Sequence, residues 1–391
     1  MKIAILTSGT MPVPAVRGGA VENLIDSYLE YNNQHRIHDI TIYSIWHPDI
    51  KRHPALYSDV NHYQYIKMDT LWAKFKKAIY KRSHQDDYYQ YTIEYFFEQA
   101  FCRLHHQDFD IIIVENRPGY VLKLKNRIST PCILHLHNDF LNTNTPQSTM
   151  IFSEFNRILC VSDYILNRVQ KINPQQLKTL TVNNSIDCKR FIKATPMQRE
   201  EHGISNKDFV IVYSGRLNKE KGILPLIQAV IKLQAIPHLK LLIIGASSYG
   251  VDKHTTSFVR QLEKEAESIR NQVIFTGYIN YMQVPSYLKM ADVAVVPSMW
   301  EEPFGLTVVE AMAAGLPLIT TRSGGIPEIC EGVATIVERE NIVDNLAAAI
   351  LDLYQHPEKR QKMAAASLER SKLFDKETYA KNFFAALNDI C

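Results

Sequence analysis

Two acidic residues lie close together in the second half of the chain. The segment 297–315 reads PSMWEEPFGLTVVEAMAAG, and seven residues separate Glu302 from Glu310. The apolar run 293–296 predicts a strand, so Glu302 falls in the loop after it and Glu310 about one turn into the next helix. A carboxylate accepts hydrogen bonds from two neighbouring hydroxyl groups at once. The pair suits recognition of a ribose and a hexose, and capping of the helix start is the structural alternative.

Basic residues and glycines follow two neighbouring strand candidates. The segment GRLNKEKG (215–222) comes after the apolar run 209–213 and contains Arg216 and Lys221. A guanidinium fork and an ammonium point charge together suit a diphosphate. Gly324 and Gly325 follow the run 316–320, where their backbone N–H groups can approach a phosphate at a helix start. Taken alone, the first motif is also compatible with surface bases and the second with an ordinary turn.

The first half of the chain has a weaker glycine motif. Gly18 and Gly19 precede a segment with apolar residues at helical spacing, so their N–H groups also fall at a helix start. The pattern is not GxGxxG, and no acid is obvious at the end of the next strand. This argues against a dinucleotide site.

Two further strand ends in the first half carry polar residues. His135 and His137 belong to the strand 132–136 and its end, where alternation places both on one face. We expect His135 to be structural and His137 to reach a ligand. The sequence Glu115-Asn116-Arg117 ends the strand 111–114, and either binding of an acceptor substrate or helix capping would explain it. By contrast, the Asp-Phe-Asp sequence at 108–110 precedes its strand, so it predicts a solvated turn.

Short apolar runs alternate with helical segments throughout the chain, which predicts parallel sheets covered by helices on both faces. We expect an α/β fold of two Rossmann-like βαβ domains that face a deep cleft between them. The first domain would comprise residues 1–185, the second 186–374, and a C-terminal helix (375–391) would return to the first domain. An aromatic helix is expected around 88–105.

Composition limits the classes of function. The chain has 391 residues, 46% hydrophobic, with a formal net charge of +3, so general binding of nucleic acid is not indicated. Its six cysteines form no CxxC pair, and no metal-ligand spacing is evident. No apolar run approaches the length of a membrane span or of a signal-peptide core, which predicts a cytoplasmic protein.

Residues 71–82 read LWAKFKKAIYKR and combine an apolar helical face with lysines and an arginine. This pattern is typical of a helix on an anionic membrane surface, and equally of a surface helix whose apolar side belongs to the core. The first interpretation predicts peripheral attachment to the inner face of the cell membrane.

With these motifs in place, the chain resembles the family 4 glycosyltransferases of the GT-B fold, including transferases of bacterial capsule, exopolysaccharide and lipopolysaccharide synthesis. The resemblance covers nearly the whole chain and is strongest over 180–335. The segment from Glu302 to Glu310 matches the EX7E motif of the family, GRLNKEKG matches its phosphate-binding segment, and SGGIPE (323–328) matches the next loop.

The resemblance implies roles for individual residues. Glu310 would hold the ribose of the donor, while Glu302 and the backbone at Phe304, Gly305 and Leu306 would hold the donor sugar. Arg216 and Lys221 would neutralise the diphosphate, so that no metal cofactor is needed. The remaining implied contacts are Gly18, Gly19, Gly324 and Gly325 with phosphates, Tyr278 and Ile279 with the base, and His137 near the reacting carbon.

The resemblance also implies retention of anomeric configuration, with a nucleotide diphosphate sugar as donor, a UDP-sugar by family frequency. The acceptor would be a saccharide or a lipid-linked oligosaccharide. The sequence departs from the family at Ser185, where Gly is usual after Asn, and at Asn138, where Gly or Asp is common. The second departure bears on the identity of the donor sugar.

Three alternatives remain open at this point. An epimerase or sugar-phosphate synthase could use the same scaffold, and an oxidoreductase is disfavoured by the absent GxGxxG motif. A non-catalytic nucleotide-sugar-binding partner of a transferase complex would have little need for the full set of Arg216, Lys221, Glu302 and Glu310.

Overall fold

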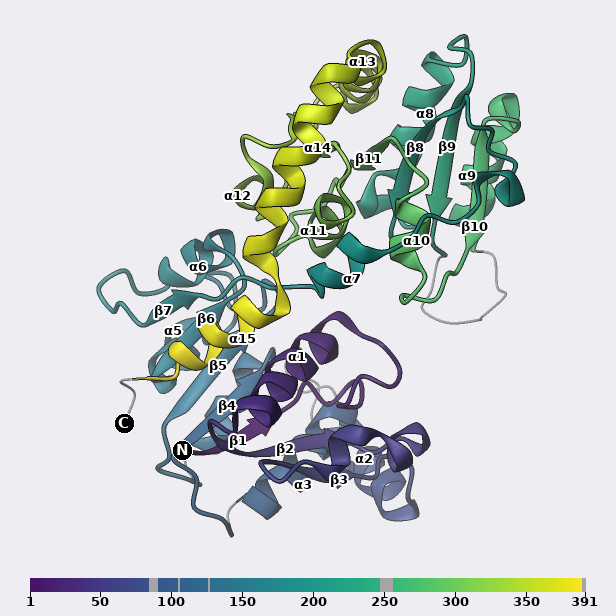
Figure 1. The fold of residues 1–391 in the computed structure, drawn as a ribbon. Coiled ribbons are helices and arrows are strands. Elements are labelled where there is room, and N and C mark those ends of the chain that lie inside the picture. The colour runs from purple at the N-terminus through teal and green to yellow at the C-terminus, as the bar shows by residue number, and fades with distance from the viewer. Residues whose placement is uncertain (84–90, 105, 126, 247–255, 389–391) are drawn as a thin grey trace. The chain divides into compact units, whose positions relative to one another are not determined.

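The structure is a computed structural model that describes residues 1–83, 91–104, 106–125, 127–246 and 256–388. It divides into two compact units (Figure 1). Unit 1 comprises Met1–Asn184 and Lys376–Cys391, and unit 2 comprises Ser185–Asp375.

Unit 1 contains a parallel sheet of seven strands in the order β3-β2-β1-β4-β5-β6-β7. The strands are β1 (Lys2–Leu6), β2 (Asp39–Ile45), β3 (Asn61–Ile66), β4 (Ile111–Glu115), β5 (Cys132–Leu136), β6 (Arg157–Cys160) and β7 (Thr179–Thr181). The central strands are continuous apolar runs because helices cover both faces of the sheet; every residue of β4 is buried.

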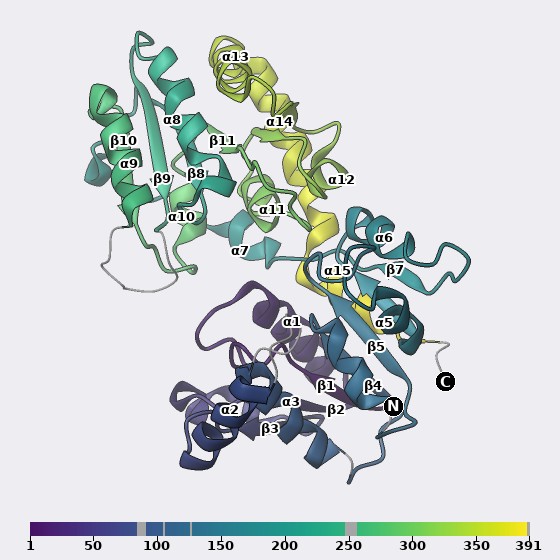
Figure 2. The ribbon, with the colours of Figure 1, turned by 180° about the vertical axis from the view of Figure 1, so that it is seen from behind.

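Helices surround this sheet. They are α1 (Ala20–His35), α2 (Leu71–Ser83), α3 (Tyr91–Leu104), α4 (Val121–Leu124), α5 (Ser148–Glu154), α6 (Asp163–Gln170) and α15 (Lys376–Ala385). The last helix packs along α1 (Figure 2). Within this contact the rings of Tyr28 and Phe383 stack with their centres 4.1 Å apart. The expected return of the C-terminal helix to the first half of the chain is therefore confirmed for its described residues; 389–391 lie outside them.

Unit 2 contains a parallel sheet of six strands in the order β10-β9-β8-β11-β12-β13. The strands are β8 (Phe209–Ser214), β9 (Leu239–Ile244), β10 (Val273–Gly277), β11 (Val293–Val296), β12 (Leu318–Thr321) and β13 (Thr335–Val337). Its helices are α7 (Cys188–Lys193), α8 (Ile223–Lys232), α9 (Ser257–Glu265), α10 (Val284–Leu288), α11 (Leu306–Ala313), α12 (Ile326–Cys330), α13 (Ile342–Gln355) and α14 (Pro357–Ser371). Apolar residues of α8, α9 and α13 pack against β8, β9 and β11 in one buried cluster.

Two parallel α/β sheets with helices confirm the expected fold class. The predicted aromatic helix is α3, which begins at Tyr91; the expected residues 88–90 and 105 lie outside the described part of the chain. Short 3-10 turns link several elements. Within the described residues, no helix is both long and apolar enough to cross a membrane.

The strand orders locate the candidate sites. In each sheet the chain reverses direction of winding once, between β1 and β4 in unit 1 and between β8 and β11 in unit 2. Open parallel sheets bind ligands outside the carboxyl ends of the strands at such switch points. A ligand site is therefore expected in the loops after these four strands.

Candidate active site

The loops after β8 and β11 carry three of the residues expected to bind the donor. Arg216 lies two residues after β8 and is exposed, and Lys221 ends a 3-10 turn (Lys219–Lys221) in the same loop. Glu302 lies in the loop between β11 and α11 and is only 8% exposed. All three stand at the switch point of the unit 2 sheet, where a ligand is expected.

An ion pair joins the two loops. The Nζ atom of Lys221 lies 2.5 Å from Oε1 of Glu302, and the Ser298 hydroxyl donates to the same oxygen at 2.7 Å. The backbone is tied as well, because the Met299 N–H donates to the Glu220 carbonyl at 2.8 Å. Positive and negative groups are thus held in place before any ligand arrives.

Glycines allow the loops of this edge to approach each other at backbone contact distance. Gly222 has φ +70°, and a Cβ atom there would lie 1.8 Å from the Pro297 carbonyl oxygen. Gly324 has φ +55°, and a Cβ there would lie 2.2 Å from the Glu302 carbonyl oxygen. No other residue fits at either position without moving the loop that carries Glu302.

The Gly324-Gly325 turn serves a structural role that sequence reasoning did not anticipate. The Gly324 N–H donates to the Glu301 carboxylate at 2.6 Å, and the Gly325 N–H donates to the Glu302 carbonyl at 2.8 Å. Glu301 in turn pairs with Arg339 at 2.5 Å. The amides expected to contact a phosphate therefore bind the Glu302 loop in this structure.

Glu310 lies inside α11 and is 7% exposed. Burial raises its pKa to about 7, although the hydrogen bond with Tyr281 and the charge of Arg190 both act to lower the pKa. The Arg190 guanidinium also lies 4.5 Å from the centre of the Tyr281 ring. Sequence reasoning missed both partners, since Arg190 belongs to α7 and forms part of no motif near Glu310.

The other residues expected to contact a ligand in unit 2 flank these groups in the chain. Phe304 is buried against Phe374, with ring centres 5.7 Å apart. Gly305, at φ +117°, precedes the first residue of α11, Leu306. Tyr278 and Ile279 follow β10 directly, and Tyr278 is 46% exposed.

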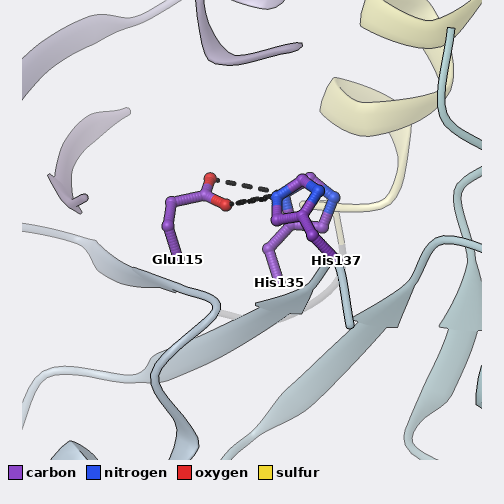
Figure 3. Close-up of side chains that lie close together, drawn as sticks. All are labelled: Glu115, His135 and His137. Atoms are coloured by element: carbon purple, nitrogen blue, oxygen red, sulfur yellow. Dashed lines mark hydrogen bonds and ion pairs between the residues drawn. The ribbon is translucent and has the colours of Figure 1, made fainter. Parts of the chain in front are cut away.

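In unit 1, the ends of β4 and β5 bring Glu115, His135 and His137 into one buried cluster (Figure 3). The Glu115 Oε2 atom lies 2.8 Å from Nε2 of His137 and 3.1 Å from Nδ1 of His135. The Asn116 side chain accepts a hydrogen bond from the backbone N–H of His137 at 3.1 Å, and the Asn116 backbone has φ +57°. His135 is buried as expected, but Glu115 and His137, which were expected to contact a ligand, are buried too.

Arg117 and the Gly18-Gly19 turn lie on neighbouring loops of the same unit. The Arg117 Nε–H donates to the Ser8 carbonyl at 3.2 Å. Gly19, at φ +108°, precedes α1, and a Cβ there would lie 2.2 Å from Oε2 of Glu22. A buried carboxylate of the same helix thus stands beside the glycines expected to meet a phosphate.

The Asp-Phe-Asp sequence is at the amino end of β4, as expected. Asp110 accepts the Lys2 N–H at 2.7 Å, opposite the edge that carries the polar clusters. It is a structural contact between neighbouring strand starts.

Residues 195–370 match the family model described as glycosyl transferases group 1. The chain is 28% identical to spore coat protein SA of Bacillus subtilis, covering 94% of this chain and 93% of that protein. It is 29% identical to the putative glycosyltransferase YtcC of the same organism, covering 93% and 86%. A crystal structure of Anabaena Alr3699/HepE in complex with UDP superposes with a TM-score of 0.71 at 19% identity, covering 99% of both chains. This similarity shows the GT-B fold.

The glycine packing gives a matched test on stability. Substitution Gly324→Ala adds a left-handed strain of about 1–2 kcal/mol and a clash with the Glu302 backbone, which typically costs a further 1–3 kcal/mol. Gly332 has φ +80° and open space within 4 Å of the position a Cβ would take, so Gly332→Ala adds the strain alone. Urea unfolding should show the larger loss for Gly324→Ala, and equal losses would contradict the close packing.

Proposed function

We propose that this glycosyltransferase, whose residues 195–370 match the glycosyl transferases group 1 family model, moves a hexose-type sugar from a nucleotide diphosphate sugar to a saccharide or lipid-linked acceptor. Unit 2 binds the donor and unit 1 the acceptor. The donor is a UDP-sugar, which the UDP complex of HepE supports. The product belongs to a cell-surface polysaccharide.

The observation that carries the proposal is the ion pair of Lys221 and Glu302 at the switch point of the unit 2 sheet, with Arg216 in the same loop as Lys221. A nucleoside diphosphate leaving group develops negative charge while the sugar becomes oxocarbenium-like. Cations already held beside that leaving group stabilise the transition state without reorganising. Lys221 meets this requirement because Glu302 and Ser298 fix its loop.

The sugar contacts follow from the same geometry. Glu302 is anchored by Lys221 and Ser298 through Oε1, and its second oxygen is available for a sugar hydroxyl in this proposal. Glu310 binds the ribose hydroxyls, and Phe304, Gly305 and Leu306 support the sugar through their backbone. Burial raises the pKa of Glu310 to about 7, and its ionised form, which only accepts hydrogen bonds, suits two ribose hydroxyls.

Transfer proceeds on the front side of the donor, with retention. The bond from the anomeric carbon to the phosphate oxygen breaks as the acceptor oxygen bonds to that carbon, and the acceptor proton passes to the leaving phosphate. Gly18 and Gly19 contact the phosphates, Tyr278 and Ile279 the base, and His137 the sugar. Gly324 and Gly325 act by holding the Glu302 loop, because their amides are bonded to Glu301 and to the Glu302 carbonyl. Glu115, Asn116 and Arg117 belong to the acceptor side, where burial restricts Glu115 to acting through its neighbours.

Attachment to a membrane surface through α2 forms a second part of the proposal. Leu71, Trp72, Phe75 and Ile79 are all at least 42% exposed, while the lysines of the helix supply positive charge. Large apolar side chains exposed on one basic helix favour an anionic lipid surface over a solvent-facing helix. A lipid-linked acceptor would be reached from such a surface.

The role of Arg216 is tested by its removal. Loss of one preorganised donor of this kind lowers kcat by roughly 100- to 1,000-fold, so Arg216→Ala should show that loss in sugar transfer or in hydrolysis of the donor. Arg270→Ala removes an exposed arginine that pairs with Glu267 and should leave kcat unchanged. Unchanged turnover in Arg216→Ala would exclude the proposed role.

The membrane proposal is tested with vesicles containing phosphatidylserine. Each lysine near such a surface contributes about 1 kcal/mol, so Lys74→Glu/Lys77→Glu/Lys81→Glu should weaken vesicle binding by roughly 100-fold or more. The variant Lys359→Glu/Lys362→Glu/Lys372→Glu makes the same change of charge in and just after α14. Equal binding of the two variants in a sedimentation assay would contradict a specific role for α2.

A further inference from the structure

Three buried hydroxyl groups lie near Glu302 at the carboxyl edge of the unit 2 sheet. Ser298 follows β11 by two residues, Thr321 ends β12, and Ser323 lies two residues further on. Ser298 is 1% exposed and the other two residues are 0% exposed. A buried hydroxyl is costly unless it is hydrogen-bonded. The partners of these three side chains therefore define what the cluster holds in place.

The Ser298 hydroxyl is committed to the Glu302 carboxylate. Its Oγ atom lies 2.7 Å from Oε1 of Glu302, compared with 3.3 Å from the Trp300 carbonyl and 3.5 Å from the Glu220 carbonyl. A hydroxyl has one proton to donate. Hydrogen bonds to a carboxylate are shorter and stronger than those to a neutral carbonyl, so the proton lies toward Glu302.

Ser298 is itself held from two sides. The hydroxyls of Thr321 and Ser323 both donate to its backbone carbonyl, at 2.6 Å and 2.7 Å. A carbonyl oxygen has two lone pairs, and these two bonds use both. The N–H of the same peptide group, that of Met299, donates to the Glu220 carbonyl at 2.8 Å. The peptide next to the Ser298 side chain is thus fixed by the loops after β8 and β12.

The other partner of the same Glu302 oxygen has a second task. The Nζ atom of Lys221 lies 2.5 Å from Oε1 of Glu302, and the Lys221 side chain is 27% exposed. In the proposed function its charge also neutralises the diphosphate of the donor. An ammonium group that turns toward a diphosphate gives up part of its interaction with Glu302. The buried Ser298 hydroxyl does not face this competition.

We propose that Ser298 is a positioning residue for Glu302, whose Oε1 it keeps bonded while Lys221 turns to the diphosphate, so that Oε2 stays available to a hydroxyl of the donor sugar. Thr321 and Ser323 act indirectly, through the Ser298 carbonyl. This inference rests on the proposed function, because it assigns recognition of the sugar, as distinct from the nucleotide, to the hydroxyl cluster.

Ser298→Ala removes the hydroxyl and keeps the carbonyl that Thr321 and Ser323 bind. Calorimetric titration compares UDP with whichever of UDP-glucose, UDP-galactose and UDP-N-acetylglucosamine the wild-type protein turns over fastest. We expect unchanged affinity for UDP, a smaller gain in affinity from the sugar, and a fall in kcat/KM of roughly 10- to 100-fold, the range for a hydrogen bond to a charged group. A wild-type gain from the sugar in this variant would overturn the positioning role.

A second variant separates the hydrogen bond from packing. Ser298→Cys keeps a side chain of similar size but replaces the hydroxyl with a weak S–H donor. It should therefore lose the same part of the sugar affinity as Ser298→Ala. Wild-type behaviour of Ser298→Cys would show that filling the space is sufficient, and would contradict the proposal.

Neighbouring residues of β12 provide a matched pair for the indirect contact. Thr321→Val and Thr320→Val each remove a buried hydroxyl at similar volume, but Thr320 donates to the Val296 carbonyl, at 2.8 Å. Thr321→Val should reduce the gain from the sugar, by less than Ser298→Ala because Ser323 still donates to Ser298. Thr320→Val should leave this gain unchanged, and equal effects of the two variants would contradict the network.

The outcomes separate this proposal from the proposed function. If the wild-type protein transfers a sugar and Ser298→Ala keeps the full gain from the sugar, the positioning role is wrong and the function stands. If the wild-type protein binds no nucleotide sugar, the function is wrong, and crystal structures still test the cluster. They should show a changed orientation of the Glu302 carboxylate in Ser298→Ala, and the same orientation in both proteins would overturn the proposal. Should Ser298→Ala fail to fold, the Thr321→Val and Thr320→Val pair decides the matter.

Discussion

Close approach of backbone to backbone at the carboxyl edge of the unit 2 sheet is the constraint on which the candidate site depends. Gly222 lies against the Pro297 carbonyl and Gly324 against the Glu302 backbone, at distances that leave no room for a Cβ atom. The loop after β11 is thereby held between the loops after β8 and β12. Glu302 and Lys221 lie on loops that this packing holds together, and an ion pair joins them.

Charge in both units is compensated before any ligand binds. Lys221 pairs with Glu302, Arg190 and Tyr281 accompany Glu310, and two histidines and a tyrosine surround Glu115. Burying an unpaired charge costs far more than burying one with its partners. Such arrangements also lower the reorganisation needed during a reaction, which is the property expected of a site that stabilises a leaving group.

Much of the fold could be predicted from the sequence, because fully buried parallel strands appear as continuous apolar runs. The runs at 111–114 and 209–213 correspond to β4 and β8, within a residue at their ends. The strand β7 (Thr179–Thr181) was missed, since it is short, stands at the edge of its sheet and is only partly buried. Such a strand carries no apolar signal for a pattern to detect.

The site was only partly accessible to the same reasoning. The spacing of the motifs predicted that Lys221 and Glu302 follow strands of the same sheet. The structure adds the ion pair between them. Arg190 and Tyr281 were missed because their proximity to Glu310 arises from tertiary packing of α7 and the loop after β10. Hydrogen bonding of the Gly324 amide to Glu301 likewise depends on a partner that no local pattern indicates.

The most direct test of the donor site is thermal stability of the wild-type protein against UDP, GDP, ADP and dTDP. A ligand that binds only the folded state stabilises it by about 2.7 kcal/mol at 100 times its Kd, which is readily measured as a rise in Tm. We predict such a rise with UDP, unaffected by EDTA. No rise with any of the four nucleotides in a folded protein would contradict a donor site in unit 2.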